Sequence, residues 1–274
     1  TLRTALAIRR RTLGDAHVNT LDSMGSLAEN LLLQERYAEA DALLLEKLNS
    51  GERAFGKDHF SAVNACISYA SSLVDQGHAD LAEPYARRAL DARRRNGKPG
   101  SLEVGQALNV LGIVLGESER LEESEVALRE AVEIYRAGTT LDSVRRYSVM
   151  ANLAEELRKR GKFDEAFVLC REVIDGLRQC SRKDLREISH GQLIMGRIAR
   201  DQKRFADAEI ELMQAHQTSA AAVGGGPRMR RLSAEALAEN YAAWHAAQPG
   251  GGYDAKAAEW KAKAQSVKGP AATP

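Results

Sequence analysis

The chain has 274 residues, of which 39 are basic and 38 are acidic, so its formal net charge is +1. A charge this close to zero creates no strong field that would attract nucleic acid or an acidic membrane, and no stretch of about 18 apolar residues could span a bilayer. Three cysteines are too few and too odd in number for a disulfide framework, which favours a reducing, cytoplasmic compartment.

The first strongly patterned segment predicts an amphipathic helix over 18–33, followed by a second helix over 38–52. The pair Leu27-Ala28, in the middle of the first helix, recurs every 42 residues as a large apolar residue followed by Ala or Gly. The later copies are Tyr69-Ala70, Leu111-Gly112, Leu153-Ala154, Met195-Gly196 and Leu237-Ala238. A fixed period of this length indicates a repeat array.

Each unit also carries a second small residue, twelve positions after the first and on the second helix of the pair. These residues are Ala40, Ala82, Ser124, Ala166 and Ala208. Small side chains at matching places in two successive helices let the backbones approach closely, and a bulky residue such as Tyr37 or Phe163 fills the turn between them. Each unit is therefore predicted to be a helical hairpin.

This signature resembles the tetratricopeptide repeat, whose usual unit has about 34 residues. The additional residues lie in the loops between hairpins, where Gly14-Asp-Ala-His17 and Gly56-Lys-Asp-His59 occur. A 42-residue unit with such a loop resembles the kinesin light chain subgroup, and also the arrays appended to many bacterial serine/threonine protein kinases. The resemblance implies an all-α fold, namely a right-handed superhelical solenoid of helix-turn-helix repeats.

The array is predicted to form a single domain over 1–268. Residues 1–12 match the second helix of a hairpin whose first helix is missing, so we expect the natural protein to extend N-terminally. Full repeats are expected at about 17–58, 59–100, 101–142, 143–184 and 185–226. An atypical terminal repeat is expected over 227–268, with helices at 232–247 and 254–266, a flexible linker at 224–227 and a flexible tail at 269–274.

Two of the loops place an acid close to a histidine, as a metal or proton-transfer site would require. His17 and His59, however, lie one period apart, as do Gly14 and Gly56. Equivalent positions in adjacent hairpins are separated by roughly 10 Å, whereas one metal ion needs nitrogen ligands at about 2.0–2.1 Å. We therefore expect both histidines to be structural, and the sequence predicts no metal site and no cofactor.

The arginine runs 9–11 and 93–95 are separated by twice the period, and both fall at the end of a second helix. Cations there complement the helix dipole, so solvated helix ends are favoured over a nucleic-acid patch. Cys66 and Cys170 fall at apolar helical positions and are expected to be buried and inert. Cys180 falls in a predicted loop and is the one candidate for a reactive thiol.

The candidate functional surface is a stripe on the first helix of each hairpin, at positions −6, −3, +1 and +4 relative to the small residue, which lines the concave face in the resembled family. In the fourth and fifth repeats this stripe gathers cations that can pair with a carboxylate or an acidic peptide. The alternative is a solvated face neutralised by Glu155, Glu156 and Asp201. The candidate groove residues are Asn109, Glu155, Arg158, Lys159, His190, Arg197 and Arg200.

No nucleophile-elbow, kinase, zinc-protease or dinucleotide motif occurs, so the chain is not predicted to be an enzyme. We expect a non-catalytic interaction module, a monomer or weak homodimer, that binds a peptide segment or partner protein in its concave groove without nucleic acid or membrane. Two alternatives stay open. The chain could be the C-terminal regulatory portion of a bacterial serine/threonine kinase, or a self-associating scaffold.

Overall fold

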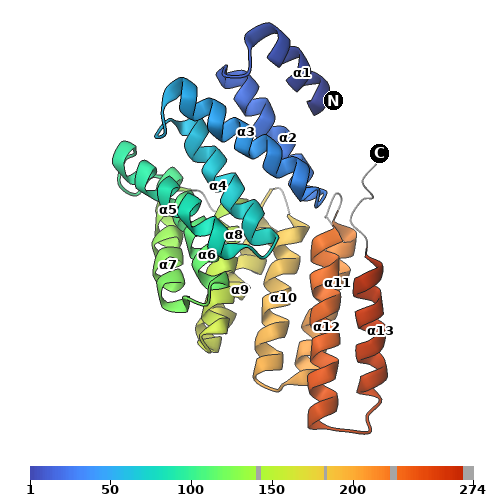
Figure 1. Cartoon of the computed structure of the whole chain (residues 1–274). Coiled ribbons are helices and arrows are strands. Elements are labelled where there is room, and N and C mark those ends of the chain that lie inside the picture. Colours follow the sequence, from blue (N-terminus) through green and yellow to red (C-terminus); the bar gives the residue numbers. More distant parts are fainter. Residues whose placement is uncertain (140–142, 182–183, 223–226, 268–274) are drawn as a thin grey trace. The chain divides into compact units, whose positions relative to one another are not determined.

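The computed structural model describes residues 1–139, 143–181, 184–222 and 227–267, in which every regular element is an α-helix (Figure 1). The helices divide into two compact units, the first from Thr1 to Ile134 and the second from Tyr135 onward. Unit 1 contains α1 (Leu2–Leu13), α2 (Val18–Leu33), α3 (Tyr37–Phe55), α4 (Phe60–Asp75), α5 (Ala79–Asn96), α6 (Leu102–Glu117) and most of α7 (Leu121–Gly138). Unit 2 contains α8 (Val144–Lys159), α9 (Phe163–Gln179), α10 (Leu185–Asp201), α11 (Phe205–Ala221), α12 (Pro227–Ala247) and α13 (Tyr253–Ser266).

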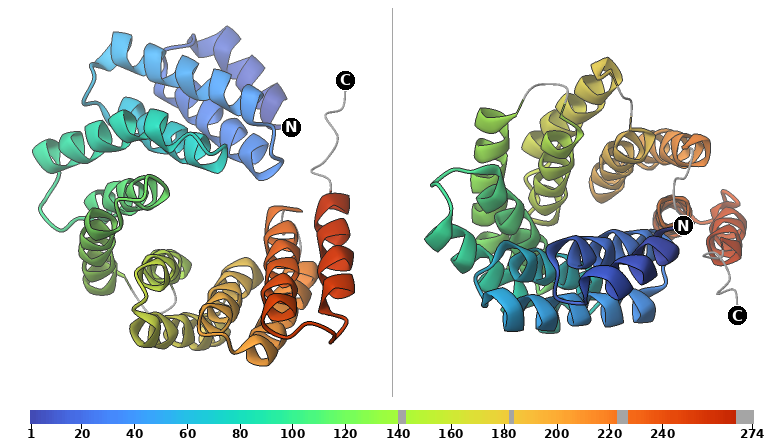
Figure 2. Two further views of the ribbon diagram at one scale, coloured as in Figure 1. Left: turned by 60° about the horizontal axis from the view of Figure 1, so that its bottom comes forward. Right: turned by 90° about the horizontal axis from the view of Figure 1, so that it is seen from above.

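Within each unit, every helix packs against its neighbours in the sequence and the first helices of successive hairpins also touch. In unit 1, α2 packs on α3 and α4, and α4 packs on α5 and α6. In unit 2, α10 contacts both α8 and α12, and the helices from α10 to α13 stack side by side in both views of Figure 2. Packing restricted to near neighbours in sequence is the defining property of a solenoid, so the predicted all-α repeat fold is confirmed.

The predicted helices correspond closely to the observed ones. The helix predicted over 18–33 is α2, and the one predicted over 38–52 is α3, which begins one residue earlier and ends three residues later. The helix predicted over 232–247 is the larger part of α12, which begins at Pro227, and α13 begins at Tyr253. The linker residues 224–226 and the tail at 269–274 lie outside the described residues, and the division into numbered repeats stays a prediction.

The small residues form the contact between the two helices of each hairpin. Ala28, Ala70 and Ala154 are fully buried. At Gly112 the helices are so close that an added Cβ would lie 2.6 Å from Leu128 Cγ. The hydroxyl of Ser124 donates a hydrogen bond to the Gly112 carbonyl oxygen at 2.7 Å. The predicted close approach of the backbones is therefore present.

The two loop histidines begin helices. The Nδ1 atom of His17 accepts a hydrogen bond from the backbone N–H of Asn19 at 3.2 Å, and that of His59 accepts one from Ser61 at 3.3 Å. Each side chain satisfies one of the backbone donors that a helix N-terminus leaves without an intrahelical partner. The loop histidines are structural, as expected.

The arginine runs lie at the ends of α1 and α5, as predicted, but they do more than face solvent. Arg9 donates to Ser23 Oγ at 2.6 Å, and Arg93 donates to Asn64 Oδ1. Three other arginines of these runs pair with carboxylates on other elements: Arg10 with Glu46, Arg94 with Glu130 and Arg95 with Asp58. The runs therefore connect successive helices.

All three cysteines are buried. Cys180 is only 5% exposed, so the expectation of a reactive loop thiol is wrong. The residue follows directly after α9, and its backbone N–H bonds the Gly176 carbonyl oxygen. Burial raises the pKa of the Cys66 thiol to about 11 and raises the pKa of Cys170 further, so both are inert thiols at neutral pH.

Candidate functional site

The candidate site occupies one side of the first helices of unit 2, which lie next to one another in the order α8, α10, α12. Six charged side chains on these helices form one connected network. We call them the A-helix face: Glu155 and Arg158 of α8, Arg197, Arg200 and Asp201 of α10, and Glu239 of α12. Five of the six lie on α8 and α10, where the sequence predicts the cationic stripe.

Glu155 is the centre of the network. Its carboxylate accepts two parallel hydrogen bonds from Arg158, from Nε at 2.9 Å and from Nη2 at 3.0 Å. Arg197 Nη1 reaches across from α10 to the same carboxylate at 3.1 Å. Two-pronged pairing of this kind fixes the plane of the guanidinium as well as its position. Glu155 therefore joins α8 to α10.

The network continues from Arg158 to the last of the three helices. Arg158 Nη1 bonds Asp201, and the other oxygen of Asp201 accepts from Arg200 Nε at 3.2 Å and Nη2 at 3.1 Å. Arg200 Nη1 then bonds Glu239. The result is a ladder in which acidic and basic groups alternate across α8, α10 and α12.

The ladder is electrically balanced, because three guanidinium groups face three carboxylates. Burial alone would raise the pKa of the Glu155 carboxyl, but the hydrogen bonds from Arg158 and the charge of Arg197 outweigh it and lower the pKa to about 2. Burial likewise lowers the pKa of Arg158, and bonding to Glu155 more than compensates. Glu155 and Arg158 are therefore both charged at neutral pH.

The two ends of the ladder differ in their access to solvent. The side chain of Glu155 is 17% exposed, whereas that of Glu239 is 59% exposed. An ion pair with one exposed partner is weak and exchanges readily with solvent or a competing ion. Arg200, which is itself only 17% exposed, is thus held on one side by Asp201, whose side chain is 24% exposed, and on the other by the more exposed and more easily displaced Glu239.

The remaining candidate residues lie beside the ladder or away from it. Lys159 Nζ pairs with Glu156 Oε1 at 2.8 Å. Burial lowers the pKa of His190, which feels the charges of Glu187 and Glu155, so its ring is neutral at pH 7. Asn109 lies on α6 in unit 1 and is half-buried, so it is not part of the A-helix face.

One part of the predicted stripe does not face the surface. The −3 positions of the second, fourth and fifth repeats, Ile67, Ala151 and Leu193, are 4%, 0% and 1% exposed. These side chains pack inside the hairpins because the position lies close to the small residue on the same helical turn. The surface stripe is therefore narrower than predicted and consists of the +1 and +4 positions with their neighbours.

The sequence contained a signal for Glu239 that the stripe did not use. Glu155, Arg197 and Glu239 are separated by one period each, so they occupy the same position in three successive first helices. Opposite charges at equivalent positions of stacked helices face one another, as Arg197 and Glu155 do. The alternation along this position predicts the contact between Glu155 and Arg197, whereas Glu239 bonds Arg200, which lies three residues after Arg197.

Two further features, a metal site and a membrane-spanning helix, are absent from the described residues. No group of three or more His, Cys, Asp or Glu side chains there could hold a metal ion. No helix in that part of the chain is long and apolar enough to cross a membrane. The stacked hairpins and the charged ladder on their surface define the class of the protein. It is a helical repeat scaffold, a class that acts through its surface.

Family models identify the repeat. Models of the tetratricopeptide repeat match residues 20–61, 61–137 and 148–179, which together make up more than half of the chain. The chain belongs to the tetratricopeptide repeat family. Its repeats make it a protein–protein interaction module on a fold that is generally a non-catalytic scaffold. Among curated proteins, none matches the sequence significantly.

Solved structures with this fold include kinesin light chain-like arrays. A putative kinesin light chain of Podosopora anserina with nearly identical TPR-like repeats has a TM-score of 0.57 at 16% identity, covering 73% of this chain and 95% of that one. BtubC (BKLC) from P. vanneervenii has a TM-score of 0.60 at 16% identity, with coverages of 88% and 94%. A Rap protein complexed with competence and sporulation factor has a TM-score of 0.63 at 13% identity, covering 97% of this chain and 70% of that one. The fold is that of a kinesin light chain-type array.

Proposed function

We propose that the A-helix face binds a peptide segment of a partner protein, and that an acidic residue of this segment is recognised by Arg200. The observation that carries the proposal is the asymmetry of the ladder, in which two hydrogen bonds to Asp201 hold the Arg200 guanidinium and its remaining partner is the mostly exposed carboxylate of Glu239. Solved structures of this fold include one protein in complex with competence and sporulation factor, which supports a ligand-binding role.

Binding is an exchange of carboxylates. An acidic side chain of the partner takes the place of Glu239 on Arg200, while Asp201 and Arg158 keep the guanidinium in position. Because Glu239 is mostly solvated, its release costs little, and the guanidinium that it leaves needs no reorganisation. A few such anchors in a groove correspond to micromolar affinity, or about 8 kcal/mol.

The other candidate residues have supporting roles in this proposal. Lys159 lies next to Arg158 on the last turn of α8 and can meet a second acidic residue of the ligand while it keeps its ion pair with the buried Glu156. The neutral ring of His190, at the −6 position of α10, offers a hydrogen bond without adding charge. Asn109, on α6 of unit 1, stays a separate prediction of a groove residue.

The experiment compares three variants in fluorescence anisotropy titrations with labelled nine-residue peptides that are rich in either Glu or Lys. Glu239→Gln removes the competing carboxylate, so the Glu-rich peptide should bind about five- to tenfold more tightly. Arg200→Gln should abolish measurable binding of that peptide. Arg204→Gln is the matched control, because Arg204 lies at the start of α11 and pairs with the exposed Asp207.

Two results would contradict the proposal. One is equal affinity of the wild type and the Glu239→Gln and Arg200→Gln variants for the Glu-rich peptide. The other is a gain for the Lys-rich peptide in the Glu239→Gln variant, since that would show that Arg200 does not select charge. The role as the C-terminal portion of a bacterial serine/threonine kinase stays a separate prediction, which the full-length gene product tests.

A further inference from the structure

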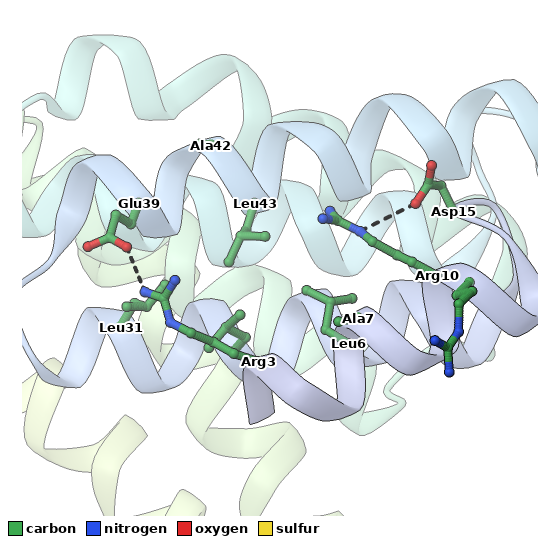
Figure 3. Close-up of a pocket in the computed structure, with 11 residues that line it drawn as sticks. Arg3, Leu6, Ala7, Arg10, Asp15, Leu31, Glu39, Ala42 and Leu43 are labelled. Carbon is green, nitrogen blue, oxygen red and sulfur yellow. Dashed lines mark hydrogen bonds and ion pairs between the residues drawn. The ribbon is translucent and has the colours of Figure 1, made fainter. Parts of the chain in front are cut away.

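A second surface feature lies in unit 1, on second helices of the hairpins, whereas the A-helix face lies on first helices. A pocket of about 770 Å³ opens on the surface of unit 1 between α1 and α3, with α2 contributing to its lining (Figure 3). Its floor is apolar and includes Leu6, Leu31 and Leu43, and its mouth lies between Ala7 and Ala42. We call this pocket the α1–α3 slot. Nothing in the A-helix face depends on it.

Ion pairs close the slot at both ends. Arg3 of α1 pairs with Glu39 of α3 at 2.7 Å, and seven residues further along α1, Arg10 pairs with Asp15 at 3.3 Å (Figure 3). Arg10 also pairs with Glu46 of α3 at 2.5 Å. Seven residues of α-helix rise about 10 Å. The open apolar part of the slot is therefore about two helical turns long.

The slot is open because of two small residues. Ala7 and Ala42 are both exposed and line its mouth from either side. At the corresponding positions of later helix pairs, one residue is polar or acidic and the other is a bulkier apolar residue. These pairs are Asn49 and Pro84, Asp91 and Val126, Glu133 and Val168, and Asp175 and Ile210. The sequence places two alanines here only in the first pair.

The shape of the slot matches a helix of a partner protein. Its lining residues on α1 follow the spacing of one helical face, at positions 3, 6, 7, 10 and 11, and those on α3 follow the same spacing at 39, 42 and 43. Two parallel ridges with small residues between them form a groove into which the side chains of a third helix can pack. A two-turn slot receives apolar side chains spaced three or four residues apart.

The charge around the slot selects the partner. Helix α1 carries Arg3, Arg9, Arg10 and Arg11 and no acidic residue. Arg3 and Arg10 are neutralised by their ion pairs, but Arg11, which lines the slot, has no ion pair or hydrogen bond within the described residues. The surface next to the slot is therefore positive, and a carboxylate on the partner would meet Arg11 there.

We propose that the α1–α3 slot is a docking site for an acidic amphipathic helix of a partner protein, which inserts apolar side chains between Ala7 and Ala42 and places a carboxylate on Arg11. The slot lies in unit 1, whereas the A-helix face lies in unit 2. Its energetic centre is the apolar insertion, because hot spots are buried anchors and rim charges mainly set orientation and selectivity.

The test uses a fluorescein-labelled helical peptide of 16 residues with Leu on one face and Glu on the other, and a twin with Lys in place of every Glu. The Glu peptide should bind the wild-type protein at least about tenfold more tightly than the Lys twin. Ala42→Leu and Ala7→Leu each fill the slot from an exposed position, so each should weaken binding by about tenfold or more. Arg11→Gln should weaken it by about three- to fivefold.

Two variants serve as controls. Ala38→Leu makes the same change at an exposed position of α3 that does not line the slot, and its affinity should equal that of the wild type. Arg200→Gln, in unit 2, should also bind the Glu peptide normally. Circular dichroism verifies that each variant keeps its helices, and with two slot-filling variants the test survives a folding failure in one of them.

The proposal is overturned if the Glu peptide shows no measurable binding to the wild type, if the Lys twin binds equally well, or if Ala42→Leu and Ala7→Leu both bind like Ala38→Leu. A loss of binding in Arg200→Gln would also overturn it, because the peptide would then occupy the A-helix face. Light scattering tests whether a second copy of this chain occupies the slot. If the wild type is a dimer and Ala42→Leu is a monomer, the slot mediates self-association and the proposal of a partner helix is overturned.

Discussion

Lys47 provides the most direct test of the hairpin packing. It lies on α3 at a position that is an alanine four periods later, at Ala215, and its side chain is 7% exposed. Its ammonium lies over Gly25 of α2, where an added Cβ would be 2.6 Å from Nζ. Four periods after Gly25 lies the buried Leu193. The fifth repeat thus has a large residue on its first helix and a small one on its second, whereas the first repeat has the small Gly25 and the large Lys47.

We predict that Lys47→Met stabilises the protein at neutral pH. Within the described residues, no ion pair or hydrogen bond reaches Lys47 Nζ, and Asp22 and Glu29 act on it only through space. Methionine is unbranched like lysine and one heavy atom shorter, so it removes the ammonium without overfilling the space above Gly25. Removing a buried charge that has no close partner is worth about 1–3 kcal/mol. The melting temperature should rise by about 2–4 °C per kcal/mol.

The advantage should depend on pH in a defined direction. Burial lowers the pKa of Lys47 below the value of 10.5 that it has when unfolded. The folded state therefore binds its proton less well than the unfolded state, and the penalty is complete at pH values below the folded pKa. As pH rises through the folded pKa towards 10.5, the lysine becomes neutral and the penalty disappears. The stability difference between Lys47→Met and wild type should shrink over this range.

Urea titrations followed by circular dichroism at pH 7 and at pH 10.5 measure both effects. Lys57→Met is the control, because Lys57 is exposed and its replacement should change stability by less than about 0.5 kcal/mol. A Lys47→Met variant that is less stable than wild type at pH 7 would refute the reasoning. A stability gain that is equal at both pH values would show that packing alone, and not the buried charge, is responsible.

Three further predictions concern the elements of the fold. Gly112→Ala should destabilise the protein by about 1–3 kcal/mol, because the new Cβ would collide with the branch point of the Leu128 side chain; urea titration measures this, and no loss would contradict the close approach. His17→Ala should lower stability by about 0.5–1 kcal/mol, whereas His78→Ala, at a helix start without a side-chain cap bond, should not. A reagent that labels thiols by disulfide exchange should modify none of the three buried cysteines until urea unfolds the chain. Fast labelling of the native protein would contradict their burial.

The fold could be predicted because the same hairpin pattern occurs several times in the sequence. A single hairpin pattern is ambiguous, but the small residues at Ala28 and Ala40 recur at the same spacing in each unit, so each copy supports the others. The histidine loops could be interpreted for the same reason, since a motif that repeats with the period belongs to the repeat. Cys180, the candidate for a reactive thiol, is buried, and the sequence did not show this because the residue stands at the end of α9 and not within a helical pattern.

The candidate site could be predicted only in part. Periodicity located the cations on α8 and α10, because residues that share a repeat position share a surface. It did not show that Arg200 is bonded to Glu239 of the next helix, since ion pairing depends on the exact stagger of neighbouring helices. The α1–α3 slot could not be predicted either, because it arises from two alanines that are far apart in sequence and meet only in the packed structure.

The central claim, that Arg200 recognises an acidic partner segment by exchange with Glu239, is tested most directly by NMR of the arginine Nε–Hε groups during titration with the Glu-rich peptide. The Arg200 signal should shift progressively and saturate at micromolar to submillimolar peptide, while the signal of the exposed Arg171 on α9 stays in place. In Glu239→Gln, the same shift should saturate at lower peptide concentration. An Arg200 signal that stays in place while the peptide binds would contradict the account.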